Sequence, residues 1–294
     1  MTDVELVDKL IKSTKPSDIF PDDWKKLYLS YSKLIHPDFC SLSLASDAMA
    51  KMNNYKDLLE NGMPFVDESG PFRVFEKRIE YVVTKDNKAL LTKSYNNYKI
   101  LMGLHDKSSE NFKRYLPESM VMENDKLIIR LKDRSVPLSG QQLPQIHVNW
   151  LFSRMFELTL WFTQIGYSHM GFNPTTVFVV PETHGIIAIS FYHMIKIGKK
   201  AETISAKYKM WYPTDLFTKK IASEDVDLEL CKKIALYLLG DKSACGTKLR
   251  VDKNVNQKIL SFLIMKHENN KDEYTQYREI IKNNFEKKFY PLNL

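Results

Sequence analysis

The feature that most constrains the fold is an abrupt change of pattern near residue 62. Residues 2–61 carry apolar side chains at spacings of three and four with very few glycines, which predicts helices. A cluster of Gly, Pro, Asp and Ser follows at 62–71 and indicates turns. Segments such as 73–83 and 126–131 are then rich in residues that favour strands. We therefore predict an α+β chain with more than one domain.

The same patterns divide the chain into four parts. We expect a helical domain at 1–62, a linker at 63–71, a small sheet-containing part at 72–138 and a larger, mainly helical part at 139–294. No internal repeat is found. Beyond residue 83 we expect strands at 88–92, 120–122 and 126–131, a helix at about 95–115 and a long buried helix at 147–165. A hairpin of strands at 176–180 and 185–189 and helices at about 223–294 complete the expected elements.

Composition excludes several classes of function. Lys and Arg total 43 against 36 Asp and Glu, and this net charge of +7 includes no basic run, so no nucleic-acid partner is expected. The three cysteines, Cys40, Cys231 and Cys245, lack metal-ligand spacing, which predicts free thiols in a reducing compartment and no metal site. The sequence has neither a signal-peptide pattern nor an apolar run long enough to span a membrane. We expect a cytoplasmic protein without a membrane partner.

Two helices within the first 61 residues predict an antiparallel pair. Asp22 is the predicted N-cap of the first helix, and Pro37 ends that helix at about His36, because a residue before proline is disfavoured in helical geometry. Lys25, Lys26 and Lys33 give the exposed side of this helix a basic character. The expected apolar faces are Trp24, Tyr28, Tyr31 and Ile35 on the first helix, and Ala45, Ala48, Met52, Tyr55 and Leu59 on the second.

A basic helix, a loop with His36, Pro37 and Asp38, and a second helix together resemble the J-domain of the DnaJ family. The resemblance covers about residues 3–61. It implies that His36, Pro37 and Asp38 dock on a DnaK-type chaperone and stimulate its ATPase, while Lys25, Lys26 and Lys33 steer the approach. Lysines facing an acidic partner favour fast, salt-sensitive encounter. Phe39 and Cys40 depart from the family, which usually has basic residues after the loop.

The second part of the chain resembles a protein kinase in the order of its elements. Residues 167–179, which include His169 and Pro174, resemble the kinase catalytic loop and the strand that follows it. Ser190 falls at the position of the metal-binding Asp of the Asp-Phe-Gly motif. Asp227 begins a helix that resembles the one bracing the catalytic loop, and Lys93 is the candidate for the lysine of the small lobe's strand.

The groups that phosphoryl transfer requires are replaced in this alignment. Gly171 takes the place of the catalytic Asp, Asn173 of the loop Lys, and Thr176 of the metal-binding Asn. No carboxylate remains to hold magnesium on a nucleotide, and no glycine-rich phosphate loop precedes the first strand. The resemblance therefore implies a pseudokinase: we expect no enzyme activity, no cofactor and no metal.

The sequence favours a J-domain co-chaperone whose kinase-like part holds an unknown client protein. Two alternatives stay open, namely a divergent kinase-fold phospho- or nucleotidyltransferase recruited by its J-domain, and a scaffold protein of viral or phage type. Tyr208, Trp211 and Tyr212 lie among lysines in a cluster that suits either partner binding or core packing. The sequence names neither the client nor the host chaperone.

Overall fold

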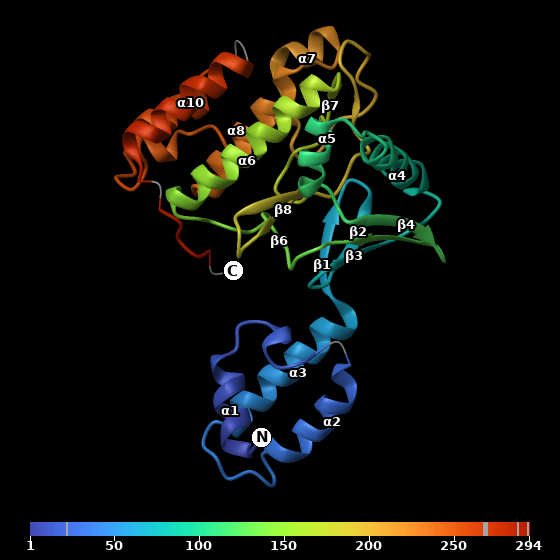
Figure 1. The fold of residues 1–294 in the computed structure, drawn as a ribbon, viewed down its shortest axis with the longest axis vertical. Coiled ribbons are helices and arrows are strands. Elements are labelled where there is room, and N and C mark those ends of the chain that lie inside the picture. The colour runs from blue at the N-terminus through green and yellow to red at the C-terminus, as the bar shows by residue number, and fades with distance from the viewer. Residues whose placement is uncertain (22, 267–269, 287, 293) are drawn as a thin grey trace. The chain divides into compact units, whose positions relative to one another are not determined.

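The computed structural model describes residues 1–21, 23–266, 270–286, 288–292 and 294 (Figure 1). Contacts divide the chain into two compact units. The N-terminal unit contains Met1–Pro64 with Arg73–Phe75, and the second unit contains Phe65–Phe72 with Glu76–Leu294. Among the described residues, none of the helices combines the length and the apolar character that crossing a membrane requires.

Up to residue 61, the described part of the N-terminal unit forms three α-helices and a short 3-10 turn. Its first helix begins with a capping box, in which Thr2 and Glu5 each accept a hydrogen bond from the other's backbone N–H. Gly62, with φ +63°, ends the last helix. The bounds are α1 Asp3–Lys12, the 3-10 turn Pro16–Asp18, α2 Trp24–Ile35 and α3 Ala45–Asn61. Helices predicted for 2–61 are thus confirmed, while the predicted cap Asp22 lies outside the described residues.

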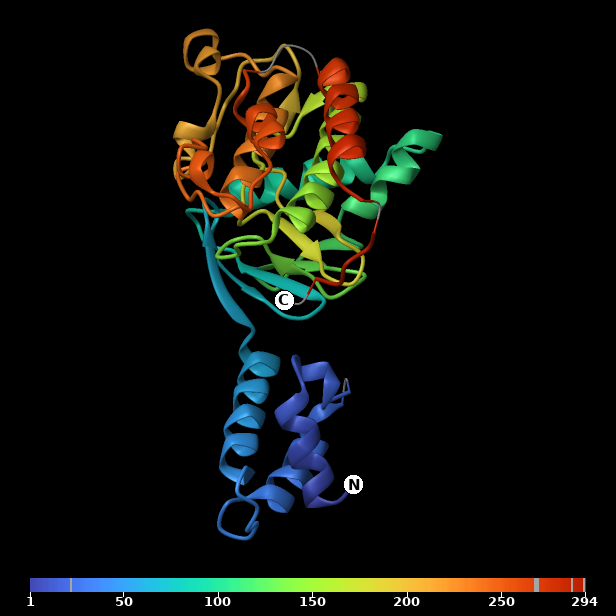
Figure 2. The ribbon, with the colours of Figure 1, turned by 90° about the vertical axis from the view of Figure 1, so that its left-hand side faces the viewer.

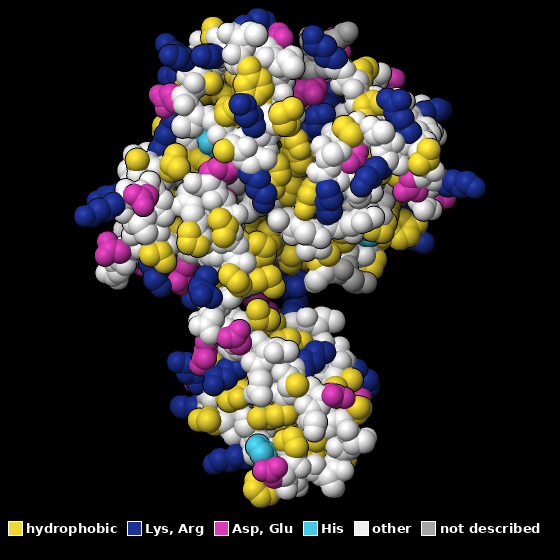
Figure 3. Space-filling view, turned by 180° about the vertical axis from the view of Figure 1, so that it is seen from behind, with side chains coloured by type: hydrophobic (Ala, Val, Ile, Leu, Met, Phe, Trp, Pro, Cys, Tyr) yellow, Lys and Arg dark blue, Asp and Glu magenta, His cyan; other side chains and the backbone are white. Residues whose placement is uncertain are grey.

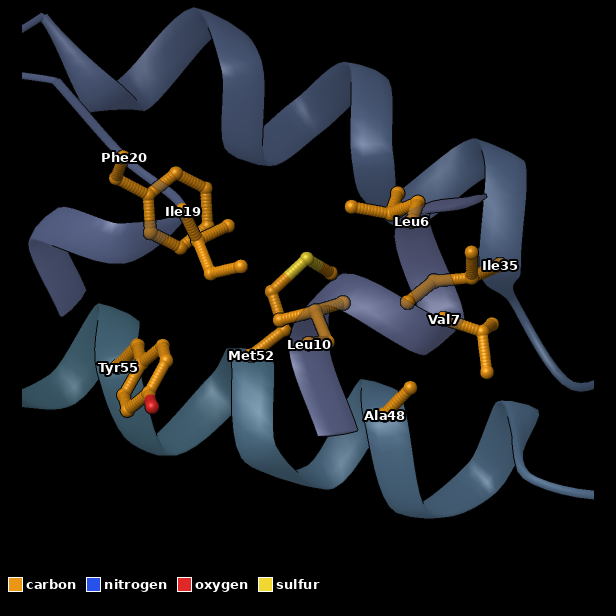
Figure 4. Close-up of a cluster of buried hydrophobic side chains, with 9 residues drawn as sticks. All are labelled: Leu6, Val7, Leu10, Ile19, Phe20, Ile35, Ala48, Met52 and Tyr55. Atoms are coloured by element: carbon orange, nitrogen blue, oxygen red, sulfur yellow. The ribbon is translucent and has the colours of Figure 1, made fainter. Parts of the chain in front are cut away.

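Apolar side chains from all three helices form the core of this unit (Figure 4). Leu10 and Met52 lie near its middle and are 0% exposed. The face predicted for α3 is buried, except for Leu59, which is partly buried. On the face predicted for α2, Ile35 is buried, and the three aromatic side chains of that face are partly buried against the cluster. The buried members are Leu6, Val7, Leu10, Ile19, Phe20, Ile35, Ala48, Met52 and Tyr55.

A five-stranded sheet follows, with strand order β1-β2-β3-β5-β4. Residues 63–71, predicted to be a linker, instead form β1 and the turn into β2. Gly70, with φ +107°, lets the chain reverse there, so its turn formers mark a hairpin rather than an extended segment. The β3–β5 and β5–β4 pairs are antiparallel, and Ile129 lies opposite both Ile79 and Met120. The strands are β1 Met63–Asp67, β2 Gly70–Val74, β3 Arg78–Val82, β4 Ser119–Glu123 and β5 Lys126–Arg130.

The strand predicted at 88–92 is wrong, because these residues begin the helix α4 (Lys88–Met102). The Asn87 side chain accepts from the Thr84 N–H at 2.7 Å and donates to the Val82 carbonyl at 2.9 Å, which closes a turn immediately before the helix. Buried positions on α4 then recur at helical spacing, at Leu91, Ser94, Tyr98 and Leu101. The predicted helix at about 95–115 is divided between α4, α5 (Lys107–Phe112) and a 3-10 turn at Lys113–Tyr115.

The remainder of the second unit is mainly helical, as predicted. Helices α6 (Gln145–Gln164), α8 (Asp225–Leu238) and α10 (Asn270–Asn284) lie side by side in both ribbon views (Figures 1 and 2). The predicted hairpin is present as β8 (Val177–Val180) and β9 (Gly185–Ala188), with β6 (Val136–Pro137) on the other side of β8. The remaining elements are β7 Tyr167–Ser168, β10 Ile195–Lys196, α7 Thr214–Lys219, α9 Gln257–Ile264, and 3-10 turns at Lys209–Trp211 and Lys248–Val251.

Candidate functional site

The His36-Pro37-Asp38 loop lies where α2 ends and the chain turns toward α3. His36 has φ −59° and ψ 130°, so the helix stops at Ile35, one residue before the proline. The His36 carbonyl accepts from the N–H groups of Phe39 and Cys40 at 2.9 and 2.8 Å, and Cys40 is buried. These bonds hold the loop as a defined turn. The three residues predicted to act together are therefore adjacent in one ordered loop.

The polar groups of this loop are accessible. The side chains of His36 and Asp38 are 43% and 77% exposed, and His36 Nδ1 lies 3.5 Å from Asp38 Oδ2. The Asp38 N–H also donates to His36 Nδ1 at 3.3 Å. The loop therefore presents an imidazole and a carboxylate side by side to solvent. Such a pair can accept and donate hydrogen bonds to a partner, and it carries negative charge when the imidazole is neutral.

The three predicted lysines lie on the exposed side of α2. Lys25, Lys26 and Lys33 are all exposed, and within the described part of the chain none of them has a carboxylate partner. The Lys25 ammonium lies 5.9 Å from the centre of the Trp24 ring. Unpaired cations on one helix face produce a positive field that attracts an acidic partner surface.

In the second unit, Asp227 holds the loop that was aligned with a kinase catalytic loop. Its two carboxylate oxygens accept from the backbone N–H groups of His169 and Met170, each at 2.7 Å. Met170 has φ +56°, so the chain turns sharply there. Although these bonds favour the charged carboxylate, burial raises the pKa of Asp227 to about 7. Asp227 therefore fixes the backbone at residues 169 and 170.

His169 is a packing residue in this structure. Its ring is stacked 4.0 Å from Phe172 and lies edge-on to Phe191 at 5.5 Å. The side chain is 1% exposed, and burial together with the nearby His193 lowers the pKa of His169 to about 3. Its Nδ1 accepts from the Gly171 N–H at 3.2 Å. A neutral, enclosed imidazole of this kind supports the loop rather than exchanging protons with solvent.

The other aligned loop residues bond to one another. Thr176 Oγ1 donates to the Gly171 carbonyl at 2.8 Å, and Asn173 Nδ2 donates to the same carbonyl at 3.1 Å. A Cβ built on Gly171 would lie 3.1 Å from the His193 ring, closer than most Cβ contacts. An aspartate at position 171 would therefore require His193 to move. The polar side chains of this loop maintain its own conformation.

Sequence reasoning missed an acidic turn between β1 and β2. Asp67 accepts from Tyr81 Oη at 2.8 Å and from both the N–H and the hydroxyl of Ser69, and Ser190 Oγ lies 3.5 Å from its carboxylate. Burial raises the pKa of Asp67. Glu68 beside it accepts from Tyr192 Oη at 3.0 Å.

Glu68 also accepts a hydrogen bond from a second hydroxyl group, Ser205 Oγ. Two neighbouring carboxylates are thus held by hydroxyl groups from β3 and from residues 190–205. This arrangement places the Asp67 carboxylate beside Ser190, the residue aligned with the metal-binding Asp of kinases. The only sequence signal for this turn is the Asp-Glu-Ser-Gly run at 67–70, whose turn-forming residues predict a linker.

The sequence suggested that Lys93 is the lysine of a small-lobe strand, and the structure shows that this is wrong. Lys93 lies in α4 and forms an ion pair with Glu202 at 2.5 Å. The strand that precedes α4 carries Tyr81, whose hydroxyl bonds to Asp67. Among the residues that the structure describes, no group of three His, Cys, Asp or Glu side chains could hold a metal ion.

The aromatic cluster at residues 208–212, which suits either partner binding or core packing, is buried in the structure. Tyr208, Trp211 and Tyr212 are 9%, 7% and 5% exposed. Tyr212 Oη donates to the Met170 carbonyl at 2.6 Å, so this cluster supports the same loop that Asp227 holds. Core packing is therefore the interpretation that the geometry favours.

No protein-family model matches the chain, and no curated protein matches it. Among solved structures, a rhoptry kinase from Toxoplasma gondii is similar with 14% sequence identity and a TM-score of 0.49, and the match covers 74% of each chain. A likeness of this size carries no argument about individual residues.

Proposed function

We propose that residues 1–62 form a J-domain that stimulates the ATPase of a DnaK-type chaperone. The observation that carries this proposal is the exposed His36-Pro37-Asp38 turn between two packed helices. Beside it lies a helix face with three lysines that have no carboxylate partner among the described residues. A partner with an acidic surface would meet the lysines first, and the imidazole–carboxylate pair would then reach its functional contacts. The chaperone-binding residues are His36, Pro37, Asp38, Lys25, Lys26 and Lys33.

The test is a single-turnover ATPase assay with purified DnaK-family chaperones, one bacterial and one from a eukaryotic cytosol. The full chain is expected to accelerate hydrolysis several-fold with at least one of them, and His36→Gln is expected to return the rate to the basal value. His105→Gln is a matched control, because His105 is an exposed histidine of the second unit. Basal rates with wild-type protein on both chaperones would refute the proposal.

We infer further that the second unit is a protein-kinase-like domain without phosphotransfer activity, which holds a client protein. Support comes from the element order, from the Asp227 brace on the loop at 169–176, and from Gly171, Thr176 and Ser190 at positions where chemistry needs acidic or amide groups. The acidic turn at Asp67 and Glu68 adds negative charge where a nucleotide would place its phosphates. Phosphate binding without a cation is unfavourable there.

A thermal-shift experiment tests this inference. Adding millimolar ATP with magnesium is expected to leave the unfolding temperature of the chain unchanged. A ligand at one hundred times its dissociation constant stabilises by about 2.7 kcal/mol, which would raise the midpoint of a unit of this size by several degrees. An active protein kinase run in parallel shows that the conditions permit binding. A saturable rise with ATP would contradict the inference and favour a divergent transferase.

A further inference from the structure

Two large apolar side chains lie on the same exposed surface as the lysines and the His36 loop. Leu29 is 63% exposed and Phe39 is 85% exposed, although both are residues that proteins usually bury. Leu29 lies one helical turn from both Lys25 and Lys33, so it is in the middle of the basic face of α2. Phe39 follows the loop directly, with its ring 5.8 Å from the His36 ring.

The fold does not require either side chain at its position. Neither belongs to the buried cluster of the N-terminal unit nor to the residues packed against it. The backbone of Phe39 is nevertheless fixed, because its N–H donates to the His36 carbonyl at 2.9 Å and the next residue, Cys40, is buried. The ring is therefore displayed on an ordered turn. An aromatic side chain on a fixed backbone loses less conformational freedom on binding than one on a mobile segment.

Charge limits the kind of partner that this surface fits. In the described part of the chain, Lys25, Lys26 and Lys33 are without carboxylate partners, so they surround Leu29 with uncompensated positive charge. Figure 3 shows that Lys and Arg side chains lie beside apolar ones on one face of the N-terminal unit. An apolar centre with a charged rim is the usual anatomy of a protein–protein interface. A complementary partner would have acidic groups around an apolar recess.

We propose that Leu29 and Phe39 are the apolar anchors of the chaperone-docking surface, and that Phe39 fills a recess on the DnaK-type partner next to the site that receives Asp38. This inference rests on the proposed co-chaperone function and names the residues that determine the affinity for the chaperone. Aromatic anchors at the centre of an interface carry a large share of binding energy, whereas rim charges act mainly on the association rate.

The experiment measures how much full-length protein is needed for half-maximal stimulation of the chaperone ATPase. Phe39→Ser is expected to raise this concentration about ten-fold, which corresponds to about 1.4 kcal/mol, and Leu29→Gln is expected to raise it several-fold. Both variants keep the fold, because neither side chain is in the core. Met210→Ser is a matched control, since Met210 is 89% exposed and lies in the second unit.

The salt dependence of the stimulated ATPase rate distinguishes the contribution of Leu29 and Phe39 from that of the lysines. Raising the ionic strength is expected to weaken wild-type and Phe39→Ser stimulation by the same factor, whereas Lys33→Gln reduces the dependence on salt. Stimulation by wild type that His36→Gln abolishes but Phe39→Ser and Leu29→Gln leave unchanged would overturn this inference alone. Absence of stimulation by wild type would overturn both the inference and the proposed function.

Discussion

Replacing Leu10 by alanine is expected to unfold the N-terminal unit while the second unit stays folded. Leu10 is 0% exposed and lies in the middle of the apolar cluster that joins α1 to α3 (Figure 4). Truncating a buried leucine costs about 2–5 kcal/mol, because the lost burial is accompanied by a cavity. A domain of this size rarely has more than about 3–5 kcal/mol of stability from its core alone. One substitution therefore removes most of what holds residues 1–62 together.

Hydrogen–deuterium exchange measured by mass spectrometry gives the result separately for each unit. Peptides from α1, α2 and α3 should lose their protection in Leu10→Ala, while peptides from α6 and α8 should keep theirs. Val4→Ala is the control on the same helix, because Val4 is 57% exposed and its truncation should cost little. Loss of protection in both units would show that they unfold as one, and full protection of α1–α3 would show that the core tolerates the cavity.

The helices of the N-terminal unit could be predicted because local chemistry determines them. Pro37 ends α2, and the buried residues Ala48, Met52 and Tyr55 follow the 3.6-residue period of α3. The exposure of His36 and Asp38 also follows from the sequence, since a loop between two packed helices has few atoms to cover it. For this unit, the position of each site residue depends on neighbours within a few residues.

The second unit was harder to predict because distant residues decide its local structure. The Ala-Leu-Leu run at 89–91 suits a strand as well as a helix, and the Asn87 turn selects the helix. Asp67 and Glu68 were assigned to a linker, because their partners Tyr81, Tyr192 and Ser205 come from later in the chain. The local sequence pattern contains no information about such distant pairs. The sequence of the acidic turn alone therefore could not predict that Asp67 and Glu68 lie in the site.

The two units differ in how they use their polar groups. In the N-terminal unit, Lys25, Lys33 and Asp38 are exposed, and they remain accessible to another protein. In the second unit, the polar side chains of the loop at 169–176 bond to one another or to its backbone. Groups already satisfied within the fold would have to break those bonds before binding a substrate. This contrast is the reason why we propose that the chain acts on a partner through its first unit.

Substitution of Asp227 is expected to have the largest effect on the second unit. Asp227→Leu removes both acceptors of the His169 and Met170 N–H groups and leaves these two buried donors without partners. Each orphaned donor costs about 1–3 kcal/mol, so the predicted loss of unfolding free energy is about 2–6 kcal/mol. Asp227→Asn keeps one acceptor and should lose about half as much. Urea denaturation, followed by the fluorescence of the three tryptophans in this unit, measures the order of the variants.

The pH dependence of the unfolding free energy, compared between wild type and Asp227→Asn, isolates the effect of the Asp227 carboxylate. Burial raises the pKa of folded Asp227 to about 7, above its unfolded value of about 3.8, so the folded state binds the proton more tightly. Wild type should therefore lose stability relative to Asp227→Asn as the pH rises from about 4 to about 7, by at most about 1.4 kcal/mol per pH unit. Asp225→Asn, in the first turn of the same helix, is the control, and it should change stability by less than about 1 kcal/mol. If Asp227→Leu were as stable as this control, the two N–H bonds would not hold the loop, and the inferred brace would be wrong.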